Sequence, residues 1–202
     1  MSTSTPGSSG TPPQASHWNL PNTLTWLRIL MIPAIVLLFY LLPYPWGDTA
    51  ACAAFALAGI TDSLDGYYAR KLGLTSRLGA FLDPVADKLI VAAALILIVS
   101  RDPRWFMAIA AIVIIGREIA ISALREWMAT IGQSKSVAVN VFGKVKTIAQ
   151  LIAIPFLLFN GVLFGLFHTV VVGRWLIWIA AFLTLWSMVV YLKAAWAAGE
   201  PK

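Results

Sequence analysis

The sequence predicts an all-α membrane protein with several spans, and two observations support this. Of its 202 residues, 59% are hydrophobic and only 12% are charged, whereas a soluble domain usually carries about 25% charged residues. The hydrophobic residues are also gathered into six long runs. Each run is close to the ~20 residues that a helix needs to cross a bilayer. We therefore expect a polytopic protein with six transmembrane helices.

The elements follow in order along the chain. Residues 1–18 are rich in Ser, Thr, Gly and Pro, which predicts a disordered N-terminal tail. Residues 19–202 are expected to form one membrane domain. Asn22 is placed to cap the first span and Pro43 to end it. The predicted spans are 24–42, 49–69, 78–99, 105–124, 141–159 and 172–195.

The basic residues predict the orientation of these spans. Twelve Lys and Arg residues lie on the side that holds both chain ends, and three (Arg101, Arg104 and Arg174) lie on the other. Cytoplasmic connections carry the excess of Lys and Arg in membrane proteins. Both termini are therefore expected in the cytoplasm, and the net charge of +6 is assigned to orientation and to anionic lipid rather than to nucleic acid.

Four aspartates form the candidate site: Asp62, Asp65, Asp83 and Asp87 lie at the predicted cytoplasmic ends of the second and third spans. Residues three or four apart share one face of a helix, so two facing pairs can converge. Carboxylate oxygens suit Mg²⁺ or Mn²⁺, which commonly serve phosphoryl transfer. The structural alternative is ion pairing with nearby basic residues, namely Arg70, Lys71, Arg77 and Lys88.

The aspartates belong to a longer pattern. It reads Asp62-x-x-Asp65-Gly66-x-x-Ala69-Arg70, then eight residues, then Gly79-x-x-x-Asp83-x-x-x-Asp87. This pattern resembles in full the signature of the CDP-alcohol phosphatidyltransferases. The resemblance implies a six-helix membrane domain, a homodimer and two divalent metal ions, Mg²⁺ or Mn²⁺.

The resemblance also implies a role for each signature residue. The metal ligands would be Asp62, Asp65, Asp83 and Asp87, and Asp87 would also be the catalytic base. The CDP moiety would contact Asp62, Asp65, Gly66, Ala69, Arg70, Ser76 and Gly79.

Further segments of the sequence narrow the choice of acceptor. The segments 19–29, 61–71, 82–89, 117–129 and 137–147 resemble the bacterial subfamily whose acceptor is glycerol 3-phosphate. The implied reaction moves a phosphatidyl group from CDP-diacylglycerol to the 1-hydroxyl of glycerol 3-phosphate. It yields phosphatidylglycerol phosphate and CMP in phospholipid biosynthesis at the bacterial inner membrane, with the active site on the cytoplasmic side.

An anionic acceptor needs fixed cations, and the sequence offers five: Arg28, Arg117, Arg125, Lys144 and Lys146. Guanidinium groups bind phosphate in a bidentate manner, and lysine acts as a point charge. Membrane orientation alone would also explain basic residues at these places. Glu118 directly follows Arg117, and since adjacent residues do not face each other on a helix, it is expected to orient other groups.

Two other readings remain open. The same chemistry could use another alcohol, such as inositol phosphate or serine. A transporter could instead use intramembrane aspartates as an ion path, but that predicts carboxylates near the middle of the membrane and matched halves of the chain.

Overall fold

The computed structural model describes residues 20–72, 77–130 and 141–199, with side chains over 25–62, 81–130 and 145–193. The expected disordered tail, residues 1–18, lies outside the described residues. The described part is all-α apart from one short hairpin. Its elements are α1 (Leu20–Leu41), α2 (Trp46–Leu72), α3 (Arg77–Arg101), α4 (Trp105–Thr130), α5 (Val141–Phe159), β1 (Val162–Leu163), β2 (Phe167–His168) and α6 (Thr169–Gly199).

Each of the six predicted spans coincides with a helix, and most of the helices extend a few residues beyond the apolar run. The assignment of Asn22 as an N-cap is wrong, because α1 already begins at Leu20 and runs through it. The hairpin was not expected from the sequence. Its strands pair Val162 with His168, and the turn between them uses positive φ angles at Phe164 (51°) and Gly165 (71°).

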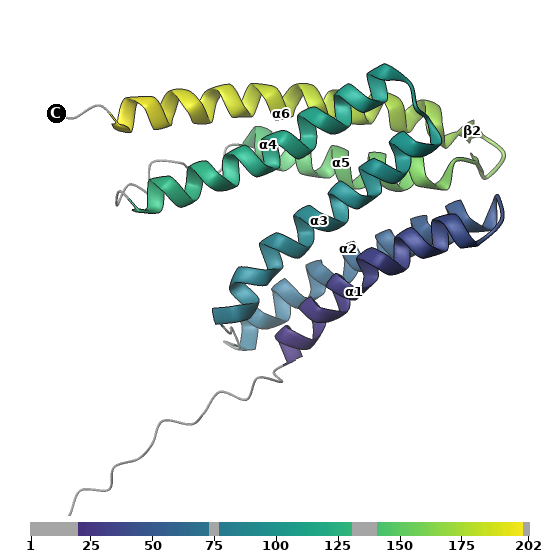
Figure 1. Cartoon of the computed structure of the whole chain (residues 1–202), viewed down its shortest axis with the longest axis horizontal. Coiled ribbons are helices and arrows are strands. Elements are labelled where there is room, and N and C mark those ends of the chain that lie inside the picture. The colour runs from purple at the N-terminus through teal and green to yellow at the C-terminus, as the bar shows by residue number, and fades with distance from the viewer. Residues whose placement is uncertain (1–19, 73–76, 131–140, 200–202) are drawn as a thin grey trace, which may run out of the picture.

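The helices form two groups joined by α3 (Figure 1). α1 packs against α2 and α3, while α6 packs against α4 and α5. α3 also contacts α4 and α5, and α2 contacts α5, so the two groups are connected at several places. The start of α1, the end of α2 and the start of α3 lie at one end of the molecule, and the hairpin lies at the opposite end. This arrangement brings the two halves of the aspartate pattern to the same end.

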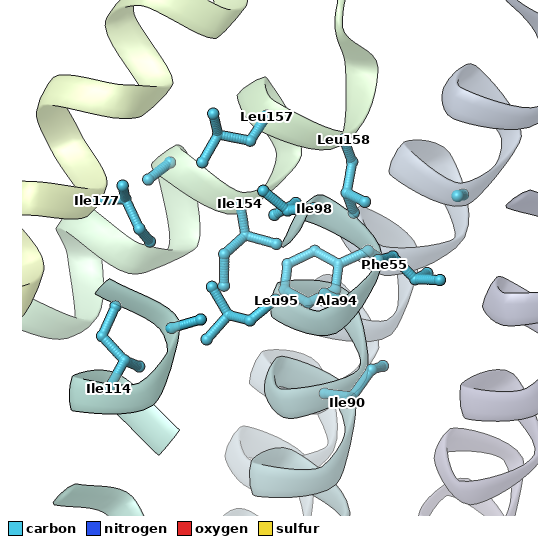
Figure 2. Packing of buried hydrophobic residues seen from close by; sticks show 14 of the residues in the cluster. Phe55, Ile90, Ala94, Leu95, Ile98, Ile114, Ile154, Leu157, Leu158 and Ile177 are labelled. Atoms are coloured by element: carbon cyan, nitrogen blue, oxygen red, sulfur yellow. The ribbon is translucent and has the colours of Figure 1, made fainter. Parts of the chain in front are cut away.

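The apolar core lies where α3 crosses α5 (Figure 2). Branched aliphatic side chains of the two helices interlock there, with contributions from α2, α4 and α6. The labelled core residues are Phe55, Ile90, Ala94, Leu95, Ile98, Ile114, Ile154, Leu157, Leu158 and Ile177. This packing fixes the position of α3, which carries two of the aspartates.

The outer surface of the helices is apolar too. On α4, Trp105, Ile112 and Ile119 are 73%, 69% and 63% exposed, although a surface helix of a soluble protein is polar on its outer face. Among the described residues, Trp105–Thr130 and Thr169–Lys193 are long and apolar enough to cross a bilayer. An all-α fold with apolar surfaces on both sides of its helices is consistent with a membrane protein.

Candidate active site

Three of the four predicted aspartates meet around a single guanidinium. Arg28 of α1 places Nη2 2.6 Å from Oδ1 of Asp62 on α2. Its Nη1 lies 2.9 Å from Oδ1 of Asp87 and 3.9 Å from Oδ1 of Asp83, both on α3. The expectation that the two spans bring their carboxylates together is therefore met for these three residues.

The side chains of this cluster differ in how far they are exposed to solvent. The side chain of Arg28 is 4% exposed, whereas those of Asp62, Asp83 and Asp87 are 43%, 47% and 47% exposed. The guanidinium thus lies beneath an acidic surface and holds it from below. Thr25, one turn before Arg28 on α1, adds a hydrogen bond by donating Oγ1–H to Oδ1 of Asp83.

Arg28 was predicted to bind the acceptor, and in the structure its guanidinium contacts carboxylates. Its acceptor role stays a prediction. Thr25 was not singled out at all. The available signal was its spacing, since two polar residues three apart in an apolar run share one helix face.

The three carboxylates around Arg28 are candidate ligands for a divalent cation. Hard oxygen donors of this kind are what Mg²⁺ and Mn²⁺ take. Three carboxylates against one guanidinium leave a net charge of −2, which one divalent cation would balance. Within the described side chains no three acidic, His or Cys residues form a metal-binding group, and the side chain of Asp65 lies outside them. The donor chemistry and the charge fit a divalent cation.

For the other signature positions, the structure describes at most the helix in which they lie. Asp65, Gly66, Ala69 and Arg70 lie in α2 and Gly79 lies in α3, but their side chains are outside the described residues. Ser76 falls outside the described residues altogether. Of the four cations proposed as alternative partners of the aspartates, Lys88 is the one whose side chain is described. The residues that would contact CDP therefore remain predictions.

A second polar cluster joins α4, α5 and α6. Oε1 of Glu118 accepts from Nη1 of Arg117 at 3.2 Å and from Nζ of Lys146. Nη2 of Arg117 donates to Oγ of Ser187 at 3.2 Å. The expectation that Glu118 orients another group is met by Lys146. The expectation that it would not face Arg117 is wrong, because the long arginine side chain reaches its neighbour. Glu118 holds two cations, each less than 10% exposed.

α6 supplies a ring between two arginines. The Tyr191 ring centroid lies 5.9 Å from the guanidinium of Arg117 and 5.7 Å from that of Arg125. Nη2 of Arg125 also donates to Oη of Tyr191 at 3.4 Å. Three of the predicted acceptor cations therefore gather at α4, α5 and α6, and the side chain of Lys144 lies outside the described residues.

One pocket runs between the two clusters. It has a volume of about 260 Å³ and is lined by Pro84, Asp87, Lys88 and Val91 of α3, Glu118 of α4, and Thr147 and Gln150 of α5. Asp87 comes from the carboxylate cluster and Glu118 from the cation cluster. A small molecule in this pocket would lie beside the candidate base and next to the group that holds Arg117 and Lys146.

The chain is similar to known proteins over most of its length. Residues 18–186 match the family model described as CDP-alcohol phosphatidyltransferase. A CDP-diacylglycerol–glycerol-3-phosphate 3-phosphatidyltransferase of Escherichia coli K12 is 47% identical over 89% of this chain and 96% of its own length. A protein of the same name from Pseudomonas fluorescens is 50% identical over 88% of this chain and 90% of its own. The family match covers the carboxylate cluster, the residues that line the pocket, and Arg117, Glu118, Arg125 and Lys146 of the second cluster. The chain belongs to the CDP-alcohol phosphatidyltransferase family.

Proposed function

We propose that the chain transfers a phosphatidyl group from CDP-diacylglycerol to the 1-hydroxyl of glycerol 3-phosphate, giving phosphatidylglycerol phosphate and CMP. The observation that carries the proposal is the pocket that has Asp87 on one wall and Glu118, the holder of two buried cations, on another. A small molecule in this pocket would have a base beside it and the cations Arg117 and Lys146 close by, in contact with Glu118. The names of the similar bacterial proteins support the same reaction.

The donor side of the site is assigned to the signature. Asp62, Asp65, Asp83 and Asp87 would hold one or two Mg²⁺ or Mn²⁺ ions, as their oxygen donors and excess negative charge suggest. A bound divalent cation would neutralise charge on the phosphate oxygens. The cytidine diphosphate would rest on Gly66, Ala69, Arg70, Ser76 and Gly79, where small residues let a ligand approach the helices closely.

Asp87 is proposed as the general base. It lines the pocket and its side chain is about half exposed, so a hydroxyl group can reach it. Asp87 takes the proton from the 1-hydroxyl as this oxygen forms a bond to the phosphorus that carries diacylglycerol. The bond from that phosphorus to the CMP oxygen breaks, and CMP leaves. Arg28 and Thr25 hold the carboxylates in place from beneath.

The acceptor phosphate is assigned to the cation cluster, with Arg117, Arg125, Lys144 and Lys146 as its candidate ligands. Arg117 and Lys146 share the single carboxylate of Glu118, which leaves one positive charge on that group of three. Arg125 adds another from the same helix as Arg117. A phosphate drawn toward these cations would leave the glycerol carbons between them and Asp87.

The membrane setting completes the proposal. Residues 19–202 are assigned to one catalytic domain with six spans, both termini and the active site at the cytoplasmic face of the bacterial inner membrane, and a homodimeric assembly. The diacyl chains of the donor would then stay in the lipid while its head group reaches the carboxylates.

The test is an acceptor panel with CMP release as the readout. The purified protein in mixed micelles with CDP-diacylglycerol receives glycerol 3-phosphate, inositol phosphate or serine, each with Mg²⁺, Mn²⁺ or chelator. The highest kcat/KM is expected for glycerol 3-phosphate, with no release in chelator. A higher kcat/KM for inositol phosphate or serine would assign a different acceptor.

A further inference from the structure

The amide of Gln150 is buried in the helix bundle. The residue is 7% exposed, and its Nε2 makes no hydrogen bond to any group in the part of the chain that the structure describes. Gln150 lies on α5 and lines the pocket between Asp87 and Glu118. No sequence motif pointed to this residue. Most buried polar side chains have a hydrogen-bond partner, and an exception on a pocket wall indicates a partner supplied by a ligand.

The charge of the pocket wall restricts what that ligand group is. The wall carries the carboxylates of Asp87 and Glu118 and the ammonium of Lys88. Glu118 also contacts the cations Arg117 and Lys146. A phosphate is drawn to cations and is the poorer match for a neutral amide. A hydroxyl oxygen is the better match, since an amide N–H donates to it without adding charge.

Glycerol 3-phosphate has two hydroxyl groups, and this step rests on the proposed function. The 1-hydroxyl is the reacting group and lies at Asp87, and the phosphate lies toward the cations. The 2-hydroxyl is between them along the molecule. We propose that Gln150 donates a hydrogen bond from Nε2 to the 2-hydroxyl oxygen of the acceptor and so makes the site selective for a polyol phosphate.

The test compares two acceptors in two proteins. Gln150→Met keeps the length of the side chain and removes the donor. Steady-state CMP release is measured with glycerol 3-phosphate and with 3-hydroxypropyl phosphate, which lacks the 2-hydroxyl. In the wild type, kcat/KM is expected to be higher for glycerol 3-phosphate. In Gln150→Met, kcat/KM should fall about tenfold for glycerol 3-phosphate, the loss expected for one hydrogen bond. It should stay within about threefold for 3-hydroxypropyl phosphate.

A matched control and a stability measurement exclude a merely structural role. Thr184 of α6 is also fully buried with an unpartnered Oγ1, but it does not line the pocket. Thr184→Val should leave the ratio of the two kcat/KM values unchanged. Gln150→Met should also keep a substrate-free Tm at least as high as that of the wild type, because it removes an unbonded buried donor.

The experiment separates a failure of the role of Gln150 from a failure of the proposed function. An active wild type whose preference for glycerol 3-phosphate survives in Gln150→Met, or a variant that loses both acceptors equally, would overturn the role of Gln150 alone. A wild type that releases no CMP with glycerol 3-phosphate would overturn the proposed function and this inference together.

Discussion

At the scale of single residues, Arg28 organises the acidic end of the molecule. It comes from α1, yet it contacts carboxylates on α2 and α3. A guanidinium suits this place because its fixed fork presents several donors in one plane. Lysine would offer a single ammonium and could not span the same three oxygens.

Replacing Arg28 should therefore lower the stability of the protein as well as its activity. Arg28→Ala leaves three carboxylates without their cation, and a loss of about 1–3 kcal/mol in the free energy of unfolding is expected. This is less than for a fully buried pair, since the carboxylates are close to half exposed and can be hydrated. Arg28→Lys should recover part of the loss. Denaturant titration in mixed micelles measures both, and equal stability of Arg28→Ala and wild type would contradict the assignment.

Asp87 is expected to matter for chemistry rather than for folding. Asp87→Asn keeps the shape of the side chain but cannot take a proton, so kcat/KM should fall by about 10²–10⁴-fold, the usual contribution of a general base. The variant should still elute as the wild type does in gel filtration. CMP release with CDP-diacylglycerol and glycerol 3-phosphate gives the measurement, and activity near that of the wild type would rule out Asp87 as the base.

At the scale of helices, a buried ion pair ties α2 to α3 at the end opposite the site. Asp48 in the first turn of α2 is 0% exposed and accepts from Arg101 at the end of α3, while Asn160 after α5 donates Nδ2–H to it at 3.3 Å. Nearby, Asp102 accepts from Arg104 and Arg174. The three arginines assigned to the outer side are thus all paired with carboxylates, which leaves little free positive charge there.

Replacing Asp48 and replacing Arg101 should not lower the free energy of unfolding by the same amount. Arg101→Ala strands a fully buried carboxylate and should cost about 3–5 kcal/mol. Asp48→Asn leaves Arg101, which is 41% exposed and can be hydrated, so its cost should be less than half as large. Neither change should alter the KM for glycerol 3-phosphate in the folded protein. Unfolding curves in mixed micelles decide the order, and a larger loss in Asp48→Asn would contradict this explanation.

At the scale of the whole molecule, many large apolar side chains are exposed along the helices, which fits a bilayer. Trp46, Trp105 and Trp175 are each at least 70% exposed and lie at the end that holds the hairpin. Indole side chains favour the membrane–water interface. The proposed orientation puts this end outside and the carboxylate cluster in the cytoplasm.

Cysteine labelling tests that orientation. In a Cys52→Ala background, Phe164→Cys places a thiol on the hairpin turn, where the native side chain is 86% exposed. In spheroplasts it should react with a membrane-impermeant maleimide, whereas a cysteine added after Lys202 should react only once the membrane is permeabilised. The reverse labelling pattern would invert the orientation, and labelling of both thiols in intact spheroplasts would mean that α6 does not cross the membrane.

Prediction from sequence worked best where the cause is local. The helices follow from apolar runs whose length the bilayer sets, and the convergence of Asp62 with Asp83 and Asp87 follows from helical spacing and a short connection. The hairpin was missed, because a two-residue strand has no periodicity to recognise. Arg28 was given another role, since its partner Asp87 is 59 residues away in the chain and no local pattern links them.

The sequence by itself determined the all-α membrane fold, the family and the identity of the carboxylates, because composition, run length and residue spacing are local properties of the chain. Only the tertiary structure decided that Arg28 lies beneath those carboxylates, that Glu118 gathers Arg117 with Lys146, and that the buried amide of Gln150 lines the pocket between the two clusters. These contacts depend on how α1, α4 and α5 pack around α3. Helix packing is set by the fit of many side chains from distant parts of the chain, which no single segment encodes.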